Sequence, residues 1–305
     1  METLSQDTRP QTPSSPDSVS PAEVAAVRLA GGTLLDNLRG MKVVWQRELI
    51  RFRRNRLRIL TSLAQPVLFL FVLGTGLSTL VRGRADLGGF DFRTFMFPGI
   101  VAMTVLFTAV FSAVSIVWDR EFGFLREILV APVNRGAIIL GKAFGGATVA
   151  TAQGLIMLAL AGFVHVPYSP LLMLTLVGEM ALTAFMITAI GLMLASRMAE
   201  VQAFQVVIQF FVMPMFFLSG AMFPLSALPR WLAVLTKLDP LSYAVDPMRR
   251  AIFAAVHAPA VAQHAFSPGM SWGGWLLPIW FELLLMVGIA AITMAAAVWQ
   301  FTRPG

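Results

Sequence analysis

Apolar residues gather along the chain in six long runs that are separated by short polar segments. A helix that crosses a bilayer needs about 20 mostly apolar residues, and each run reaches that length. The pattern therefore predicts six transmembrane helices over residues 59–81, 95–118, 137–164, 170–196, 201–223 and 275–299. Arg197 and Glu200 place a tight turn at a membrane surface between the fourth and fifth runs.

A basic amphipathic segment, MKVVWQRELIRFRRNR over residues 41–56, stands directly before the first run. At helical spacing Trp45 and Phe52 share an apolar face, whereas Arg47 and Arg51 lie largely on another. We expect this helix in the inner membrane interface, held by apolar burial and by attraction to anionic membrane lipid. Two roles stay open, a topogenic anchor that needs only the charge, and a mechanical element.

The composition is that of a membrane protein. Of the 305 residues 57% are hydrophobic and 13% are charged, against roughly 25% charged residues in soluble domains. The net charge of +7 would suggest nucleic acid in a soluble chain, but no nucleic-acid partner is expected here, because the distribution of charge matters more. Residues 1–34, rich in Ser, Thr, Pro and Gln, are expected to form a disordered tail before a membrane domain over residues 35–305.

Positive charge is unevenly distributed between alternate connecting segments. If the N-terminus is cytoplasmic, the cytoplasmic segments from residue 39 onward hold most of the Arg and Lys residues. The positive-inside rule then predicts a multi-pass protein of the cell membrane with both termini in the cytoplasm.

One charged stretch, DREFGFLREILVAP over residues 119–132, lies on the cytoplasmic side between the second and third predicted spans. At helical spacing Phe122, Leu125 and Ile128 share one face, while Gly123 points elsewhere. The pattern predicts a short helix with an apolar ridge, which suits docking into a groove on a soluble partner. A turn that packs only on lipid is the alternative.

Two runs resemble a known family. WDREFGFLREILVAPVNRGAIILGKAFGG, residues 118–146, resembles the signature loop of type-2 ATP-binding-cassette exporter permeases, especially the daunorubicin-resistance-type transmembrane subunits. PMFFLSGAMFPLSALPRWLAVLTKLDPLSYAVDPMRRAIF, residues 214–253, resembles their fifth span and outer hairpin. The resemblance covers most of residues 40–300. It implies an all-α polytopic membrane protein with six transmembrane helices, an N-terminal interfacial helix, a cytoplasmic coupling helix, and an outer helical hairpin between spans five and six.

The family match also implies partners and a function. It implies a permease that pairs with a second copy or a paralogue and with nucleotide-binding ATPase subunits, and that exports an amphiphilic drug, lipid or glycolipid. ATP and Mg would be bound by the partner subunit, so no cofactor is expected on this chain. The residues implied to form the coupling contact are Glu121, Phe122, Gly123, Phe124, Leu125 and Arg126.

The segment GAIILGKA, residues 136–143, matches a phosphate-binding loop only in part. It ends in Ala143 where such a loop needs Ser or Thr, and it opens a membrane span instead of following a strand. Gly141 and Gly145 instead form a G-x-x-x-G step that permits close helix packing. The chain is therefore not expected to bind ATP itself.

Three polar residues, Gln153, Glu179 and Glu282, fall inside predicted spans. An ionised carboxylate there costs a few kcal/mol or more, so each acid is expected to be protonated, paired, or directed to water or the bundle interior. We assign Glu179 a packing or pathway role, while snorkelling explains Glu282 equally well. The alternative function is an ion-coupled secondary transporter that uses Glu179 and Glu282 as a proton relay, although no internal repeat is visible.

Catalytic and metal sites are not expected. His165, His257 and His264 do not share metal-ligand spacing, and no nucleophile motif or paired catalytic carboxylates occur. A membrane enzyme acting on a lipid-linked substrate would need polar clusters in its loops, and the loops are poor in them.

Overall fold

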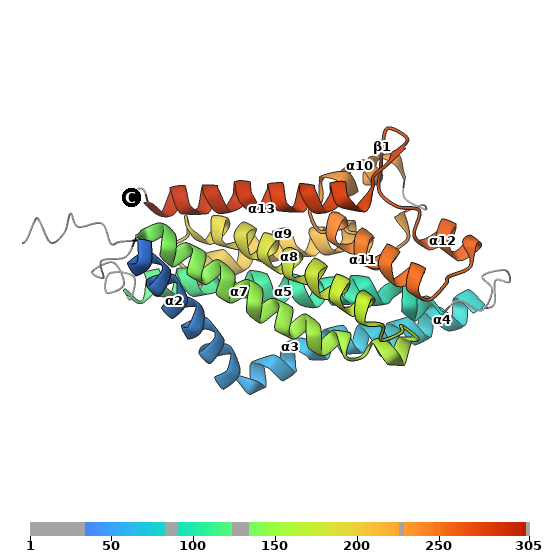
Figure 1. The fold of residues 1–305 in the computed structure, drawn as a ribbon, viewed down its shortest axis with the longest axis horizontal. Helices are drawn as coiled ribbons and strands as arrows, with labels where there is room; N and C mark the ends of the chain where they lie inside the picture. The colour runs from blue at the N-terminus through green and yellow to red at the C-terminus, as the bar shows by residue number, and fades with distance from the viewer. Residues whose placement is uncertain (1–33, 83–90, 124–133, 226–228, 303–305) are drawn as a thin grey trace, which may run out of the picture.

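The computed structural model (Figure 1) describes residues 34–82, 91–123, 134–225 and 229–302, and these are almost entirely helical. The helices are α2 (Leu34–Arg54), α3 (Arg56–Leu68), the π-helical turn η1 (Phe69–Leu73), α4 (Gly74–Arg82), α5 (Phe92–Glu121), α7 (Arg135–Leu158), the short η2 (Ala161–Val164), α8 (Pro170–Ala195), α9 (Val201–Leu218), α10 (Arg230–Leu238), α11 (Ser242–Ala255), α12 (Ala260–Phe266) and α13 (Ile279–Thr302). An antiparallel hairpin of β1 (Ser271–Trp272) and β2 (Trp275–Leu276) precedes α13.

Among the described residues, five helical stretches are long and apolar enough to cross a membrane: Ile59–Thr79, Phe92–Glu121, Pro170–Ala195, Val201–Leu218 and Ile279–Thr302. They correspond to the first, second, fourth, fifth and sixth predicted spans, so the all-α polytopic class is confirmed. The third predicted span corresponds to α7, which packs against α5 and α8 but is less apolar. The reason is its content of Lys142, Gln153 and several glycines.

Several predicted span boundaries are wrong by a few residues; the third predicted span, for example, runs to Val164, whereas α7 ends at Leu158. The fifth helix ends at Leu218, and Gly220 then takes a left-handed φ of +71°. The sixth begins at Ile279, because Trp275 pairs with Trp272 across a Gly-Gly turn of positive φ. Apolar runs continue past the ends of helices, into the buried turn after α9 and the exposed hairpin before α13, so hydropathy alone overran these ends.

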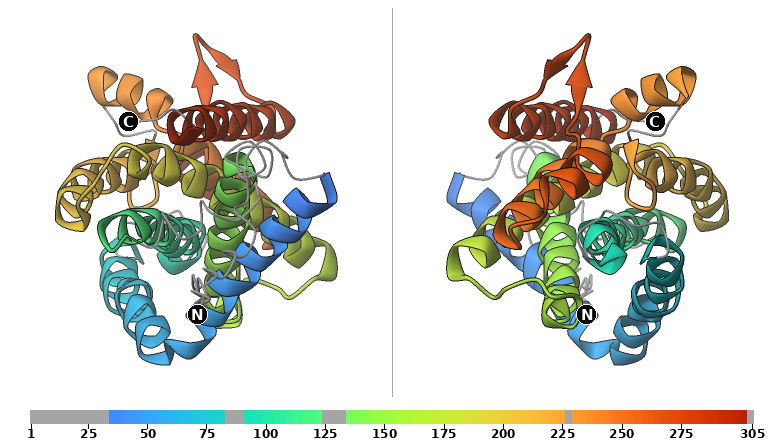
Figure 2. Two further views of the ribbon diagram at one scale, coloured as in Figure 1. Left: turned by 90° about the vertical axis from the view of Figure 1, so that its left-hand side faces the viewer. Right: turned by 90° about the vertical axis from the view of Figure 1, so that its right-hand side faces the viewer.

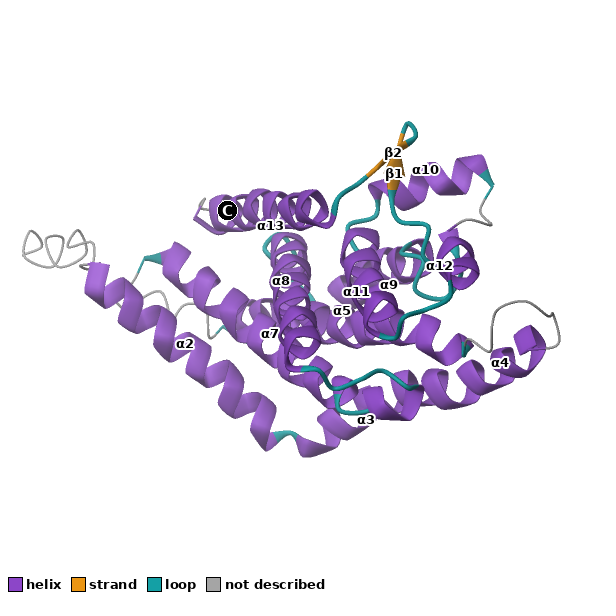
Figure 3. Cartoon of the chain, turned by 45° about the vertical axis from the view of Figure 1, so that its right-hand side comes forward, coloured by secondary structure: helices purple, strands orange, loops and turns teal. Residues whose placement is uncertain are grey.

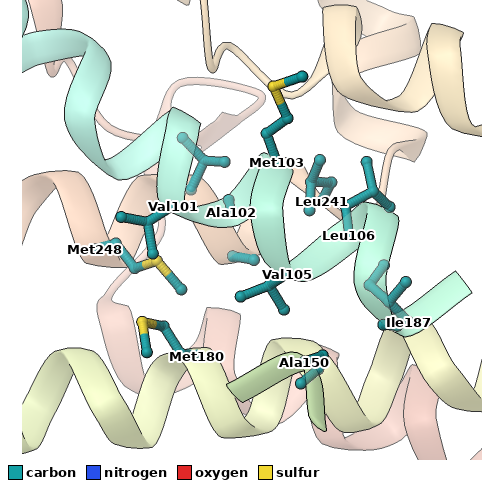
Figure 4. Packing of buried hydrophobic residues seen from close by; sticks show 14 of the residues in the cluster. Val101, Ala102, Met103, Val105, Leu106, Ala150, Met180, Ile187, Leu241 and Met248 are labelled. Carbon is teal, nitrogen blue, oxygen red and sulfur yellow. The ribbon is translucent and has the colours of Figure 1, made fainter. Parts of the chain in front are cut away.

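The core of the bundle is α5. Within its most apolar part 78% of the residues are buried, against 17% for the α3–α4 stretch and 22% for α9. A helix that is apolar on all sides suits such a central position. Figure 4 shows Val101 and Val105 of α5 meeting Met180 of α8 and Met248 of α11.

The other helices surround this core. Seen end-on, α13 lies on one side of α5, α7 and α8, and α3 with α4 lies on the opposite side (Figure 2). Helix α2 crosses α7 and meets α3 at Asn55, so that the two form an open V (Figure 3). Arg135, at the start of α7, donates to the carbonyl of Thr302 at 3.4 Å. The end where α2 begins and α13 ends is called the base below.

The end opposite the base holds α10, α11, α12 and the β-hairpin, where the sequence predicted an outer helical hairpin (Figure 1). Helix α11 packs between α5, α8 and α13. Its Arg249 is buried, lies 4.3 Å from the ring centroid of Phe95, and donates to the carbonyl of Gly220 at 2.6 Å. The segment between spans five and six is therefore built into the bundle.

Asp91 joins three segments at this outer end. It caps α5 by accepting a hydrogen bond from the Arg93 backbone N–H at 3.0 Å, and Ser78 of α4 donates to it at 2.7 Å. His165, beyond α7, lies 3.8 Å away. Burial raises the pKa of this carboxyl, but the hydrogen bonds from Arg93 and Ser78 outweigh burial and lower the pKa to about 2.

The Asp91 carboxylate should stabilise the fold in a defined pH range. Because its folded pKa of about 2 lies below its ordinary value of 3.8, its contribution is complete above pH 3.8 and is lost as the pH falls towards 2. The difference in unfolding temperature between wild type and Asp91→Asn, measured in detergent, should be constant near neutral pH and shrink over that acid range. A difference that persists at the acid end would show that charge is not the cause.

Close contact between α2 and α7 depends on glycine. A Cβ at Gly141 would lie 2.8 Å from the Met41 carbonyl oxygen, and one at Gly145 would lie 2.8 Å from Glu48 Cβ. The predicted G-x-x-x-G step is confirmed, and its partner is α2.

Replacing Gly141 should separate these helices. Gly141→Ala is expected to lower the free energy of unfolding by about 1–3 kcal/mol, because the obstructing atom is backbone and cannot rotate away. Thermal unfolding of the purified protein measures this. Gly178→Ala on α8 is the matched control: a Cβ there meets nothing within 4 Å, so it should be neutral or slightly stabilising. Equal effects of the two variants would contradict the packing argument.

Candidate functional site

Buried charges gather near the base, where α2, α5 and α7 meet. Lys142 Nζ lies 2.6 Å from Asp119 Oδ2 and 3.6 Å from Glu48 Oε1. Arg47 adds a second cation 3.1 Å from the same Asp119 oxygen. Lys142 also donates to Ser115 Oγ at 3.0 Å. We call Arg47, Glu48, Asp119 and Lys142 the charge cluster.

The charge cluster fixes three helices relative to one another. The side chains of Lys142 and Asp119 are 1% and 4% exposed. A charge removed from water costs several kcal/mol unless an opposite charge and hydrogen bonds compensate it. Each helix supplies a group that the other two need, so sliding any of them would leave a buried charge without a partner.

Sequence reasoning missed this cluster. Lys142 was considered only within an incomplete phosphate-binding motif, although a lysine inside an apolar run is itself a signal of a buried partner. The expected lipid-facing role of Trp45 and Arg47 needs correction. Trp45 donates through Nε1 to Thr148 of α7 at 3.1 Å, and Arg47 pairs with Asp119. This face of α2 therefore packs on protein.

The last turn of α5 holds the turn between α8 and α9. The Arg120 guanidinium donates to the carbonyls of Ser196 at 2.8 Å and Met198 at 3.1 Å. Glu121 Oε2 accepts a hydrogen bond from the Val201 backbone N–H at 2.8 Å. A cation at the end of α8 and an anion at the start of α9 both match the helix dipoles. We call Arg120 and Glu121 the α5 clamp.

Half of the predicted coupling contact lies in the described part of the chain. Glu121 is the last residue of α5, and Phe122 is 67% exposed. Gly123 takes a left-handed φ of +78°, which ends the helix. The predicted cytoplasmic helix therefore does not run continuously through Gly123. The other three predicted contact residues, Phe124, Leu125 and Arg126, lie outside the described residues.

A cavity of about 170 Å³ lies between α2–α3 and α5–α7. Gln153, 2% exposed, sits on its wall and joins three helices. Its Nε2 donates to Ser62 of α3, and its Oε1 accepts from Thr108 of α5 at 3.0 Å. Arg51 and Phe52, predicted on the interfacial helix, also line this cavity.

The two intramembrane acids have different surroundings. Glu282 is fully buried, and its Oε1 lies 2.6 Å from an Arg250 nitrogen that also pairs with Asp246. Its burial in an ion pair with α11 excludes snorkelling. Glu179 on α8 is 6% exposed, and its Oε2 has no hydrogen-bond partner within the part of the chain that the structure describes. It lies in the packed interior of the bundle.

No metal site is evident in the described ranges. Groups of three or more His, Asp or Glu side chains at metal-binding distance do not occur there. The charge cluster contains two acids, Glu48 and Asp119, but both are directed at Lys142.

These features define a multi-pass helical membrane protein with a polar centre at its base. The family model described as ABC-2 type transporter matches residues 39–253, and the chain belongs to this family. It is 30% identical over 234 residues to nodulation protein J of Sinorhizobium fredii, covering 74% of this chain and 88% of the relative. It is 28% identical over 217 residues to the putative transport permease ycf38 of Cyanophora paradoxa (68% and 72%). It is 30% identical over 158 residues to the probable multidrug ABC transporter permease YbhR of Escherichia coli (51% and 43%). Family membership implies a partner ATP-binding subunit in the transporter complex.

Breaking the charge cluster on one side only should be costly. Lys142→Met or Asp119→Leu alone is expected to lower the free energy of unfolding by about 3–5 kcal/mol, because each removes the nearest ion-pair partner of a buried charge and leaves it with only Arg47 or only Glu48. The double variant should lower the free energy of unfolding by clearly less than the sum of the two single effects, since the remaining Arg47 and Glu48 carry opposite charges. Unfolding of the purified proteins in detergent completes the double-mutant cycle.

An exposed ion pair on α2, the helix that carries Arg47 and Glu48, provides the control. Asp36 and Arg39 of α2 lie 3.8 Å apart with side chains 44% and 79% exposed, so Asp36→Asn should cost less than about 1 kcal/mol. Strictly additive effects of the two cluster substitutions would mean that Lys142 and Asp119 do not depend on each other.

Proposed function

We propose that this chain is the transmembrane permease subunit of an ATP-binding-cassette exporter, which moves an amphiphilic molecule outward using ATP and Mg bound by a separate nucleotide-binding subunit. One observation carries the proposal. The consecutive residues Asp119, Arg120 and Glu121 attach the end of α5 to α2 and α7, to the end of α8, and to the start of α9. A displacement applied at this point would reach four other helices.

The proposed topology has six spans, with α7 as the third and both termini in the cytoplasm. An even number of spans brings Leu34 and Thr302 to the same side, and both lie at the base (Figure 1). The excess of Arg and Lys in the segments on that side supports a cytoplasmic base. Helix α7 can span the membrane although it carries Lys142 and Gln153, because both side chains have partners inside the bundle. We take residues 35–305 as the permease domain and residues 1–34 as a tail.

A second permease copy or paralogue is part of the proposal. Gln202, Gln205 and Gln209 of α9 are exposed and, at spacings of three and four, share one helical face. An amide that faces hydrocarbon loses its hydrogen bonds, which costs of order a few kcal/mol. Coverage of this face by another subunit or by a water-filled pathway would remove that cost, whereas membrane lipid would contact the apolar faces.

The ATP-binding subunit would act through the segment that follows α5. Phe122, exposed and directly beyond the α5 clamp, is available to a partner. Because a ligand shifts an equilibrium only by its differential affinity for the two states, this contact must bind one nucleotide state of the partner more tightly. The α5 clamp would then pass the change to α8 and α9.

Docking and transmission should be separable by mutation. With the ATP-binding subunit co-expressed and the complex in nanodiscs, Phe122→Ala is expected to weaken association by about tenfold, as for an exposed aromatic anchor. Glu121→Ala should leave association near wild type but lower the permease-dependent ATP hydrolysis, because α5 loses its bond to Val201. Co-purification and hydrolysis measure the two effects.

Arg135→Ala is the control, since it removes a base arginine that bonds Thr302 outside the clamp. Association with the ATP-binding subunit and ATP hydrolysis should both stay unchanged in this variant. A rate of ATP hydrolysis that is the same with and without this chain would contradict the proposal. It would favour the ion-coupled alternative, in which the buried Glu179 is the group to replace, because Glu282 is held by Arg250.

A further inference from the structure

The cavity lies inside the V formed by α2 and α3, against α5 and α7 (Figure 3). Its wall is buried on the core side, at Ser115, Val149 and Gln153, and exposed on the other side, at Arg51 and Thr61. The cavity is thus closed towards the core and open towards the outside of the bundle.

Its depth places it next to the base. On α5 the lining residues run from Phe107 to Trp118, which is roughly 16 Å of helix at about 1.5 Å per residue. Trp118 stands in the last turn of α5, beside the α5 clamp. With the base in the cytoplasm, the cavity reaches from the inner membrane surface towards the middle of the bilayer.

The polar groups on its wall are mainly uncharged. They are the amides of Asn55, Gln65 and Gln153 and the hydroxyls of Thr61, Ser62, Thr108, Ser112 and Ser115. Amides and hydroxyls offer both donors and acceptors, whereas ionised side chains offer only one kind. Such a wall matches a ligand that itself carries many hydroxyl groups.

The charged groups on the wall are already neutralised. Glu48 and Arg51 line the cavity and lie 3.7 Å apart. The neighbouring Lys142 is held by Asp119. A phosphate would need a cation that is not committed to a carboxylate, and a quaternary ammonium group would need an uncommitted anion. Neither occurs among the lining residues in the described part of the chain.

Four aromatic rings complete the lining, those of Phe52, Phe107, Phe111 and Trp118. They provide flat apolar surfaces between the polar groups. The volume of the cavity is about 170 Å³. This is room for one compact headgroup, so the hydrocarbon chain of an amphiphile would stay on the open side.

The wall that faces the open side is also the one most easily moved. Pro66 interrupts the backbone hydrogen bonds of α3, and the helix continues as the π-helical turn η1. Bending of α3 at this point would widen the V without disturbing the charge cluster on the other arm.

We infer that this cavity receives the uncharged, polyhydroxylated headgroup of an amphiphile that approaches from the inner leaflet. The inference rests on the proposed export function and names its substrate class. Gln153 and Thr108 bind the headgroup from the core side, Ser62 binds it from α3, and the four aromatic rings enclose it.

Photolabelling tests the headgroup preference directly. The complex of this chain with its ATP-binding subunit, in nanodiscs, is irradiated with three probes that share one alkyl chain, carry the diazirine directly beside the head, and differ in that head: a glucoside, a phosphate and a trimethylammonium group. Mass spectrometry quantifies labelling of peptides that contain residues 107–118 and 149–153. The glucoside should label them about tenfold more than either charged probe, the effect of one or two buried hydrogen bonds.

Variants show whether the cavity is responsible. Gln153→Leu and Gln65→Leu should each reduce glucoside labelling several-fold; Gln65 is exposed on the wall and has little packing to lose. Gln300→Leu is the matched control, because Gln300 also accepts a hydroxyl hydrogen bond between helices, from Ser196, but lies on α13. Its labelling should equal wild type.

The outcomes separate this inference from the function it rests on. Equal labelling by the three probes, preference for a charged head, or glucoside labelling that survives both cavity variants would overturn the headgroup assignment. ATP hydrolysis that still depends on this chain in the same samples would leave the exporter proposal intact. Loss of that dependence in wild type would instead overturn the exporter proposal, whatever the labelling.

Discussion

The bundle is organised around one ammonium group, that of Lys142, which must remain paired inside an apolar interior. Asp119 and Glu48 provide the pairing, and they come from helices that are separated in sequence by the whole first span. The requirement sets where α2 lies on α7, and the glycines of α7 allow the close approach that the pairing needs. The cavity inherits its shape from this arrangement, because the charge cluster holds one arm of the V and a hydrogen bond from Gln153 to Ser62 holds the other.

Three neighbouring residues at the end of α5 divide their contacts among different parts of the bundle. Asp119 binds α2 and α7, Arg120 binds the end of α8, and Glu121 binds the start of α9. Because α5 is also the most buried helix, a rotation of its last turn could not be absorbed by lipid. The same turn carries Trp118 on the cavity wall. The end of α5 and the shape of the cavity are therefore mechanically linked.

Hydropathy predicted the spans well, since burial in lipid or in protein demands the same apolar composition, but it could not mark their ends at Leu218 and Ile279. The ion pairs between helices could not be predicted from the sequence, for a different reason. Lys142 and Asp119 are 23 positions apart, and no local pattern states which acid meets which base. Gln153 was recognised as an intramembrane polar residue, yet its partners Ser62 and Thr108 look like ordinary helix residues in the sequence. Trp45 illustrates the general difficulty, because an apolar stripe does not reveal whether lipid or protein covers it.

The modest apolarity of α7 has a consequence for how the protein is made. A lysine inside a span raises the cost of inserting that helix into the bilayer alone, and α7 also carries Gln153. The groups that neutralise both side chains lie on α2, α3 and α5, which leave the ribosome earlier. In the proposed six-span topology, helix α7 can therefore enter the membrane as a late addition to segments that are already in place. The partners of Lys142 and Gln153 thus all precede α7 in the chain.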